Sequence, residues 1–356
     1  MGADPRFFRR LDRLTAQDIA GQLGSGLAGD ADSVADDVGA ADRAEPGELV
    51  FITSPALPDA LRSRAGIVIG PALKEPVSGL AAGMAYITHA SPKAAFALIA
   101  PHILAPLSHT GSEPVSIDAR VDPAANLAPG VVVGPGAVIE AGAIIGANAV
   151  IGPGVVVGEG TQIGAAAVIH CTLIGRDCRI GPCAVIGEAG FGIAPGPKGL
   201  VDLPHFGRVR IGNEVRVGAN CTIDRGMFGD TVLRDRVRID NLCHIAHNVD
   251  VGEDTLMAAF AGVSGSVHIG RGVQFGGRVG VVDHVTIGDG ARLAASAAAA
   301  KDVPPGETWA GIPAQPIQKW LRELALMKKL NAAGRVDRKG KAGQEKNTPS
   351  GGPGED

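Results

Sequence analysis

The sequence lacks the features that mark several large classes of protein. Aromatic residues make up only 3% of its 356 residues. The formal net charge is −4 and no basic stripe runs along the chain, so nothing indicates a nucleic-acid partner. The cysteines are odd in number and lack metal-ligand spacing. We interpret all five as small buried residues in a reducing cytosol rather than as redox groups: Cys171, Cys178, Cys183, Cys221 and Cys243.

Targeting and membrane-spanning segments are also missing. The N-terminus carries Arg6, Arg9 and Arg10, but no apolar run follows them as in a signal peptide. Residues 141–158 form an uncharged stretch that is long enough, by length alone, to cross a membrane. Its Gly and Pro residues recur on a six-residue interval, however, and the same pattern continues on both sides. We therefore predict a cytoplasmic protein without a membrane segment.

Glycine is in excess in this sequence, and many of its positions follow a regular six-residue interval. The 52 Gly residues are about twice the usual share. Many of them follow aliphatic residues that recur at every sixth position. The first run is Val121, Leu127, Val133, Ile139, Ile145, Ile151, Val157, Ile163 and Ile169. One interval is then five residues long, and the run resumes at Ile174, Ile180 and Ile186. It continues at Ile211, Val217 and Ile223, and finally in steps of six from Leu233 to Ala299.

A period of six matches neither the 3.6 residues of a helical turn nor the alternation of an ordinary strand. It is typical of a solenoid in which each short strand sends one aliphatic side chain inward before the chain turns a corner. Three such hexads close one triangular coil, so residues eighteen apart should stack about 4.8 Å from one another. Gly and small residues are expected at the corners, because only they tolerate the crowding or the positive φ. The predicted fold is mainly β, a left-handed parallel β-helix of hexapeptide repeats over residues 111–310.

Residues 1–110 do not follow this period, and they predict a small α/β domain. Thr15 to Asp18 forms a capping box before a short helix that ends at Gly24. Residues 49–53 and 67–69 resemble strands, and Ser91-Pro92 is a favourable start for a helix that runs to about residue 102. Within the β-helix the period is broken at 188–208 and 225–231, where we expect loops.

The period becomes helical after residue 310. One apolar face of a helix predicted over residues 311–332 consists of Ile317, Trp320, Leu321, Leu324 and Met327. An exposed helix must bury such a face, and a bundle with symmetry-related copies would do so, which predicts a homotrimer. Residues 333–356 are of low complexity and predict a disordered tail.

Ionisable residues at regular coil positions stand out, and residues 239–248 hold the densest group. From His247 a step of eighteen leads to Gly265, and a second step leads to Asp283, directly before His284. An imidazole takes up a proton near neutral pH, and an unobstructed Gly amide can hold a developing oxyanion, so this column is typical of acyl transfer. The alternative is a set of surface residues at corners, which is our interpretation of three other histidines: His102, His170 and His268.

Motifs along the chain carry a resemblance to a known family. They are Gly187-Glu-Ala-Gly-Phe-Gly192, Thr222-Ile-Asp-Arg-Gly226, Ile239-Asp-Asn241 with Ile245-Ala-His-Asn248, and Gly311-Ile-Pro-Ala-Gln-Pro316. Over about residues 12–330 the chain resembles the UDP-3-O-acylglucosamine N-acyltransferases of lipid A synthesis. An α/β domain before the β-helix belongs to that family and is missing from the related UDP-N-acetylglucosamine O-acyltransferases. The resemblance implies transfer of a (3-hydroxy)acyl chain from acyl carrier protein to the 2-amine of a UDP-sugar. It implies no cofactor of the enzyme's own, since 4′-phosphopantetheine arrives on the carrier protein.

The resemblance also implies roles for single residues. His247 matches the general base, Asp240 the carboxylate that orients it, and Gly265 the oxyanion donor. His284 matches a second histidine near the thioester. Three residues fall where the family contacts the sugar nucleotide, and none is implied as a metal ligand: Asn241, His244 and Asn248.

Substrate recognition outside the β-helix core is implied at both ends of the chain. Phe51 matches an aromatic residue that stacks on uracil, while Ser54 and Leu57 stand where Asn and Tyr are expected. This difference implies weaker or differently packed uridine binding. Basic residues gather toward the C-terminal end of an otherwise acidic chain, where we expect the acidic carrier protein to dock: Arg271, Lys301, Lys319, Arg322, Lys328 and Lys329.

Proteins of the same fold perform other functions. The UDP-N-acetylglucosamine O-acyltransferase is the principal alternative. A γ-type carbonic anhydrase would need three His around zinc, and Asp289 stands where the third is expected. A purely structural trimer would not need Asp240 together with His247 and an open Gly265. A nucleotidyltransferase would need a Gly-rich phosphate loop in a larger N-terminal domain, and the sequence shows none.

Overall fold

The computed structural model describes residues 2–54, 66–73, 80, 82–108, 111–310 and 321–331. By its internal contacts the chain divides into two compact units, Met1–Gly311 and Ile312–Asp356. The first unit contains both the N-terminal α/β elements and the β-helix, so the boundary that we placed at residue 110 stays a prediction. Several predicted features lie outside the described residues: Leu57, the segment 311–320 with Ile317 and Trp320, and the tail 333–356.

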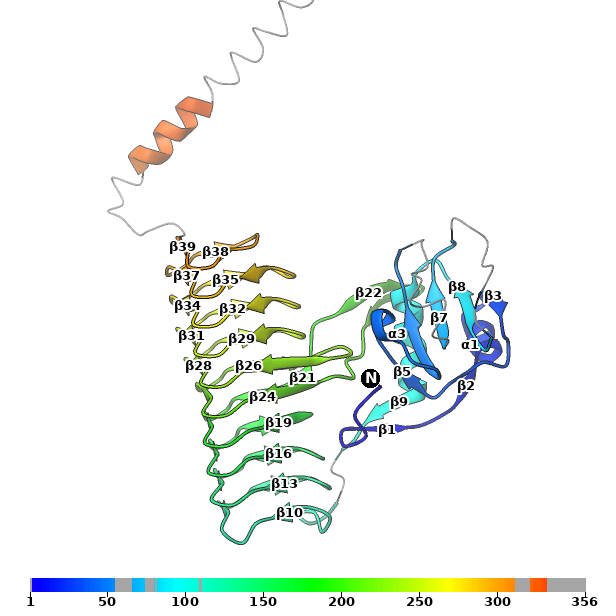
Figure 1. Cartoon of the computed structure of the whole chain (residues 1–356), viewed down its shortest axis with the longest axis horizontal. Helices are drawn as coiled ribbons and strands as arrows, with labels where there is room; N and C mark the ends of the chain where they lie inside the picture. Colours follow the sequence, from blue (N-terminus) through cyan, green and yellow to red (C-terminus); the bar gives the residue numbers. More distant parts are fainter. Residues whose placement is uncertain are drawn as a thin grey trace, which may run out of the picture. The chain divides into compact units, whose positions relative to one another are not determined.

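Three parallel sheets form the faces of the β-helix, and each coil contributes one short strand to each face (Figure 1). Face one consists of β10 (Arg120–Val121), β13 (Val138–Ile139), β16 (Val156–Val157), β19 (Thr172–Ile174), β24 (Arg208–Ile211), β27 (Asp230–Leu233), β30 (Asp250–Val251), β33 (His268–Ile269) and β36 (Thr286–Ile287). Face two consists of β11 (Asn126–Leu127), β14 (Ile144–Ile145), β17 (Gln162–Ile163), β20 (Arg179–Ile180), β25 (Arg216–Val217), β28 (Arg238–Ile239), β31 (Leu256–Met257), β34 (Gln274–Phe275), β37 (Arg292–Leu293) and β39 (Thr308–Trp309). Face three consists of β12 (Val132–Val133), β15 (Val150–Ile151), β18 (Val168–Ile169), β21 (Val185–Ala189), β26 (Thr222–Arg225), β29 (His244–Ile245), β32 (Gly262–Val263), β35 (Gly280–Val281) and β38 (Ala298–Ala299). The predicted left-handed hexapeptide β-helix is confirmed.

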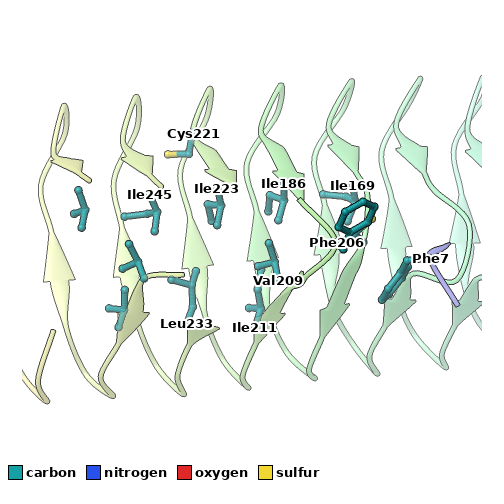
Figure 2. Packing of buried hydrophobic residues seen from close by; sticks show 14 of the residues in the cluster. Phe7, Ile169, Ile186, Phe206, Val209, Ile211, Cys221, Ile223, Leu233 and Ile245 are labelled. Atoms are coloured by element: carbon teal, nitrogen blue, oxygen red, sulfur yellow. The ribbon is translucent and has the colours of Figure 1, made fainter. Parts of the chain in front are cut away.

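The aliphatic residues of the six-residue period form the core. Ile169, Ile186, Ile223 and Ile245 stack in consecutive coils of face three and are each fully buried (Figure 2). Burial of such side chains stabilises the fold by about 1.5–3 kcal/mol each, which explains why the period persists over the whole solenoid.

Two insertions interrupt the coils where the sequence predicts breaks. The first lies between β21 and β24 and contains an antiparallel hairpin, β22 (Ile193–Gly196) with β23 (Gly199–Asp202). The second lies between β26 and β27. Both leave the β-helix where the chain passes from face three to face one. We call this edge of the prism the face 3–1 corner.

Glycines that follow the aliphatic residues are required by crowding, as predicted. A Cβ added to Gly164 would lie 2.4 Å from the backbone nitrogen of Pro182 in the next coil, closer than real Cβ atoms come. The expectation that positive φ also restricts the corners to small residues is wrong. Leu242, Phe260 and His284 all adopt φ near +60° at corners. The stacked coils on either side hold these residues in place, which offsets the strain of the left-handed conformation.

The cysteines follow the prediction with one exception. All five lie within the described residues and are free thiols, and four are buried. Cys183 is exposed, with φ of 57°, because it occupies the outward corner position rather than an inward one.

In the described residues of the N-terminal part, a mixed sheet is accompanied by helices α1 and α3. The strand order is β3 (Gly26–Gly29), β8 (Ala85–Thr88), β7 (Ile67–Gly70), β6 (Glu48–Phe51) and β5 (Asp37–Val38). Smaller elements are β1 (Phe8–Arg10) paired with β9 (Leu104–Pro106), β2 (Leu14–Thr15) paired with β4 (Val34–Ala35), and the 3-10 turn η1 (Ala41–Arg43). Helix α1 (Ala16–Leu23) has the predicted capping box between Thr15 and Asp18 and ends at Gly24 with φ of 58°.

Helix α3 (Pro92–Ile103) is also present, but its predicted cap is not. Ser91 makes no side-chain capping hydrogen bond. Its hydroxyl donates instead to the carbonyl of Pro195 in the hairpin of the first insertion, at 3.0 Å. Helix α3 contacts both strands of that hairpin, so the insertion packs on the N-terminal sheet's helix.

The second unit contains a helix over residues 321–331. Leu321 and Met327 are exposed and Leu324 is partly buried in the single chain. None of the helices in the described part of the chain is long and apolar enough to span a membrane.

Candidate active site

The predicted catalytic residues of three successive coils lie above one another at the face 3–1 corner. His247, Gly265 and His284 follow β29, β32 and β35, which pair in register. The carbonyl of His247 accepts from the N–H of Ser266 at 2.9 Å, and the carbonyl of Gly265 accepts from the N–H of His284 at 3.1 Å. The imidazole of His247 covers Gly265: a Cβ added there would lie 2.6 Å from Cε1 and 2.7 Å from Nε2 of the ring. The structure therefore brings these three residues together.

The amide of Gly265 is free to serve a ligand. Among the described residues no hydrogen bond uses its N–H. At some other corners, the side chain one coil further accepts a hydrogen bond from the N–H at this position. Asp235 accepts from Asn213, and Asp289 accepts from Arg271, each at 2.8 Å. Among the described residues the Gly265 N–H thus has no protein acceptor, which leaves it available as an oxyanion donor beside the imidazole of His247.

His247 is enclosed on its other side by the first insertion. The ring of His205 lies 5.1 Å from the ring of His247, centroid to centroid, with 60° between their planes. A Cβ added to Gly190 would lie 2.8 Å from Cβ and Cδ2 of His247. His247 Nδ1 lies 3.3 Å from Oδ1 of Asn248. The imidazole therefore occupies a slot between two glycines and a second imidazole.

Asp240 lies elsewhere in the coil. It follows β28, at the corner between faces two and three, and its carboxylate accepts from N and Nδ2 of Asn241 at 2.8 and 2.9 Å. No hydrogen bond joins Asp240 to His247 in the described part of the chain. Asn241 itself caps the neighbouring coil, where its Oδ1 accepts from the N–H of Ala219 at 2.7 Å. Within one chain, neither side chain belongs to the His247 cluster.

A different carboxylate, Asp224, belongs to that cluster. Asp224 is only 9% exposed, and burial raises its pKa, opposed by the positive charges of His244 and His247. His244 bonds to the hydroxyl of Thr222 at 2.7 Å through Nδ1 and places Nε2 3.8 Å from the Asp224 carboxylate. Asp224 therefore interacts electrostatically with both histidines.

The second insertion connects the catalytic corner to the N-terminal sheet. Oδ1 of Asn248 accepts from the N–H of Met227 at 3.0 Å, which fixes the insertion beside His247. The next residue, Phe228, packs against Phe51 and Phe96, with ring centroids 6.2 and 5.4 Å away. Phe51, the predicted uracil-stacking residue, is thereby linked to the corner through two residues of the insertion.

The remaining predicted nucleotide contact, Ser54, is exposed just beyond β6. Beside the aromatic cluster, a cavity of about 460 Å³ is lined by Arg10, Arg43, Arg208 and Phe228. Asp37 and other carboxylates also line it. A cavity with this many charged side chains suits a polar ligand.

Cys243, four residues before His247, is not prepared to act as a nucleophile. Cys243 is buried beside Cys221, and both its hydrogen bond with that thiol and its burial raise its pKa. A thiol with a raised pKa is a poor nucleophile, because the thiolate is the reactive form.

Comparison with known proteins identifies the family. The family model described as bacterial transferase hexapeptide (six repeats) matches residues 124–159 and 154–188, and that of the hexapeptide repeat of succinyl-transferase matches 208–241 and 266–296. The UDP-3-O-acylglucosamine N-acyltransferase of Caulobacter sp. (strain K31) is 48% identical over 93% of this chain and 98% of its own length. The chain belongs to the UDP-3-O-acylglucosamine N-acyltransferase family. The corresponding protein of Maricaulis maris (strain MCS10) is 44% identical over 92% of this chain and 96% of its own. Among solved structures, LpxA from Acinetobacter baumannii is 26% identical, with a TM-score of 0.45 over 56% of this chain and 72% of its own.

Two residues of the His247 cluster were missed by the sequence analysis. His205 lies in an insertion that interrupts the six-residue period, so no step of eighteen leads to it. Asp224 stands within the segment Thr222-Ile-Asp-Arg-Gly226. A carboxylate directly after an inward-facing residue does not single it out, because Glu140 and Asp240 hold the same position in their hexads.

Proposed function

We propose that this enzyme transfers an acyl chain to the 2-amine of UDP-3-O-acylglucosamine in the cytoplasm, with acyl carrier protein as donor. The observation that carries the proposal is the imidazole of His247 stacked over the free amide of Gly265, in a chain of the N-acyltransferase family. A base and an oxyanion donor on the same corner are the two groups that attack on a thioester requires.

The geometry favours direct transfer. As the amine attacks the thioester carbonyl, a nitrogen–carbon bond forms, and His247 removes a proton from the nitrogen. The Gly265 N–H stabilises the tetrahedral oxyanion, with His284 one coil further on the thioester side. Collapse of the oxyanion breaks the carbon–sulfur bond, and the proton held by His247 passes to the leaving thiolate. Asp224, rather than Asp240, supplies the negative charge near the imidazole within a single chain.

Mass spectrometry of the product tests the proposal. Purified protein is incubated with acyl carrier protein that bears an acyl thioester and with a UDP-sugar that bears a free 2-amine. The expected product is an amide. An ester product on UDP-N-acetylglucosamine would instead support the O-acyltransferase alternative. In the described residues of the single chain, no group of three or more His, Cys, Asp or Glu side chains could hold a metal ion.

Docking of the carrier protein is proposed at the C-terminal end. Arg322 and Lys328 lie on the exposed helix over residues 321–331. Long-range attraction between these cations and an acidic carrier would be screened by salt. Reversing both charges should raise the apparent KM for the acyl donor and leave the KM for the sugar nucleotide unchanged. Equal effects on both constants, or none, would contradict docking there.

A homotrimer is proposed from apolar side chains that the single chain leaves exposed. Leu242 and Phe260 are 48% and 53% exposed at successive corners between faces two and three. Leu321 and Met327 are exposed on the C-terminal helix. Packing around a threefold axis would cover such surfaces. Light scattering of the wild type should return three times the chain mass, and Phe260→Asp should lower it; a wild-type monomer at micromolar concentration would refute the trimer.

A further inference from the structure

A buried histidine with no part in the proposed proton transfer lies against the general base. His205 is only 2% exposed, and its ring centroid lies 5.1 Å from that of His247. It comes from the first insertion, while His247 comes from a regular coil. A buried imidazole in contact with a catalytic one requires an explanation, because histidine is seldom fully buried.

The position of His205 is fixed by hydrogen bonds on both its side chain and its backbone. Nδ1 lies 3.0 Å from the carbonyl oxygen of Leu203, so this nitrogen carries the hydrogen and donates. The carbonyl of His205 accepts from Nε of Arg225 at 2.9 Å. Nη1 of the same guanidinium donates to the carbonyl of Gly187 at 2.8 Å. One arginine thus fastens both ends of the first insertion.

The insertion leaves the imidazole of His247 little room to turn. A Cβ on Gly190 would lie 2.8 Å from Cδ2 of His247 and 2.9 Å from Nε2 of His205. On the opposite side, a Cβ on Gly265 would lie 2.6 Å from Cε1 of His247. The ring is therefore held between the backbone of the insertion and the backbone of the next coil.

His205 is uncharged beside the imidazole of His247. Burial, with a smaller contribution from the positive charges of His247 and Arg225, lowers its pKa to about 4. His205 is therefore neutral at the pH at which an imidazole base works. A neutral neighbour lets His247 take up a proton without repulsion between like charges.

We infer that His205 is a positioning residue, which holds the imidazole of His247 over the amide of Gly265. The inference rests on the proposed function, in which His247 is the base. Misplacement of a reacting group by about 1 Å can lower a rate about 10²-fold, so a residue that only fixes the ring can have a large effect. The competing explanation is that His205 merely fills space in the insertion.

Two substitutions separate these explanations. His205→Leu fills most of the space but cannot donate to Leu203, whereas His205→Asn keeps a donor nitrogen near the place of Nδ1. We expect His205→Leu to lower kcat about tenfold or more with both KM values nearly unchanged, and His205→Asn to recover much of the loss. In a His247→Ala background, His205→Leu should change kcat less than about twofold, since residues that act through one another are not additive. His170→Leu removes another partly buried imidazole and should leave kcat unchanged.

Equal losses from His205→Leu with and without His247 would overturn the inference, as would wild-type kcat in His205→Leu. A second readout needs no substrate. The ¹⁵N shifts of the His247 ring should report one fixed tautomer in the wild type and averaged shifts in His205→Leu. Unchanged shifts in the variant would overturn the positioning role. Absence of amide product from the wild type would contradict the proposed function alone.

Discussion

Substitution of Gly265 by alanine offers a direct test of the site. The added methyl group would lie between the backbone of Gly265 and the imidazole of His247. The new Cβ would lie 2.6 Å from Cε1 and 2.7 Å from Nε2 of His247. Ordinary contacts of a Cβ begin at 3.4 Å, so the ring must move by most of an ångström. His205 and Gly190 close the opposite side, which leaves rotation out of the slot as the remaining path.

The expected effect of Gly265→Ala is a loss in kcat of about 10²-fold, near 2.7 kcal/mol, since a misplacement of about 1 Å can cost that much. The amide N–H is retained in the variant, so the loss would report on the imidazole rather than on the oxyanion donor. The backbone tolerates the change, because Gly265 does not have a positive φ. Thermal unfolding should therefore remain close to that of the wild type.

A matched control exists at the neighbouring corner. Gly277 holds the same position in its hexad as Gly265, two residues after the inward-facing residue (here Phe275), and also lacks a positive φ. A Cβ on Gly277 would have its nearest neighbour at 3.6 Å, an ordinary contact. Steady-state kinetics on both variants decides the matter. If Gly265→Ala retained wild-type kcat, or lowered kcat no more than Gly277→Ala does, the contact between His247 and Gly265 would not contribute to catalysis.

Further substitutions test the chemistry and the stability of the fold. His247→Ala should lower kcat by about 10²–10⁴-fold with the fold intact, as removal of a general base does, and His284→Ala should lower it less. Cys243→Ala should have almost no effect, and rapid-quench experiments should trap no acyl-enzyme; an equal loss in Cys243→Ala would refute direct transfer. Burial opposes ionisation of Asp4, but hydrogen bonds from Arg6 and Arg208 outweigh it and lower its pKa to about 2. This depressed pKa contributes stability above about pH 4 that is lost as the pH falls toward 2, so Arg208→Met should lower the Tm at pH 7 more than at pH 2.

The regular part of the molecule could be predicted because one rule governs it. Each inward position needs an aliphatic side chain and each coil repeats the last, so a period of six identifies the fold and a step of eighteen identifies neighbours. Steps of eighteen from His247 lead to Gly265 and to the neighbourhood of His284, and the structure places these three residues at one corner. The capping box of α1 was predicted for the same reason, since it is a local rule.

Contacts that depend on the insertions could not be predicted. The first insertion has no period, and nothing in its sequence states that His205 returns to touch His247. The orienting role of Asp240 was implied by the resemblance and not by the step rule, which places residues six positions apart on successive faces. Asp240 and His247 are only seven positions apart in the sequence, yet they lie at different corners. An orienting role for Asp240 would therefore require a second copy of the chain.

The placement of the two insertions explains why the site occurs at this coil. A free corner N–H and an unobstructed Gly are available in many coils of such a solenoid, but by themselves they face water. Both insertions leave from the face 3–1 corner in the two coils directly before His247. One supplies His205 against the imidazole, and the other, held by Asn248, reaches Phe51 through Phe228. The β-helix thus fixes the reacting groups at a precise spacing, while the irregular segments enclose them, and exclusion of water strengthens the electrostatic stabilisation that the amide of Gly265 can provide.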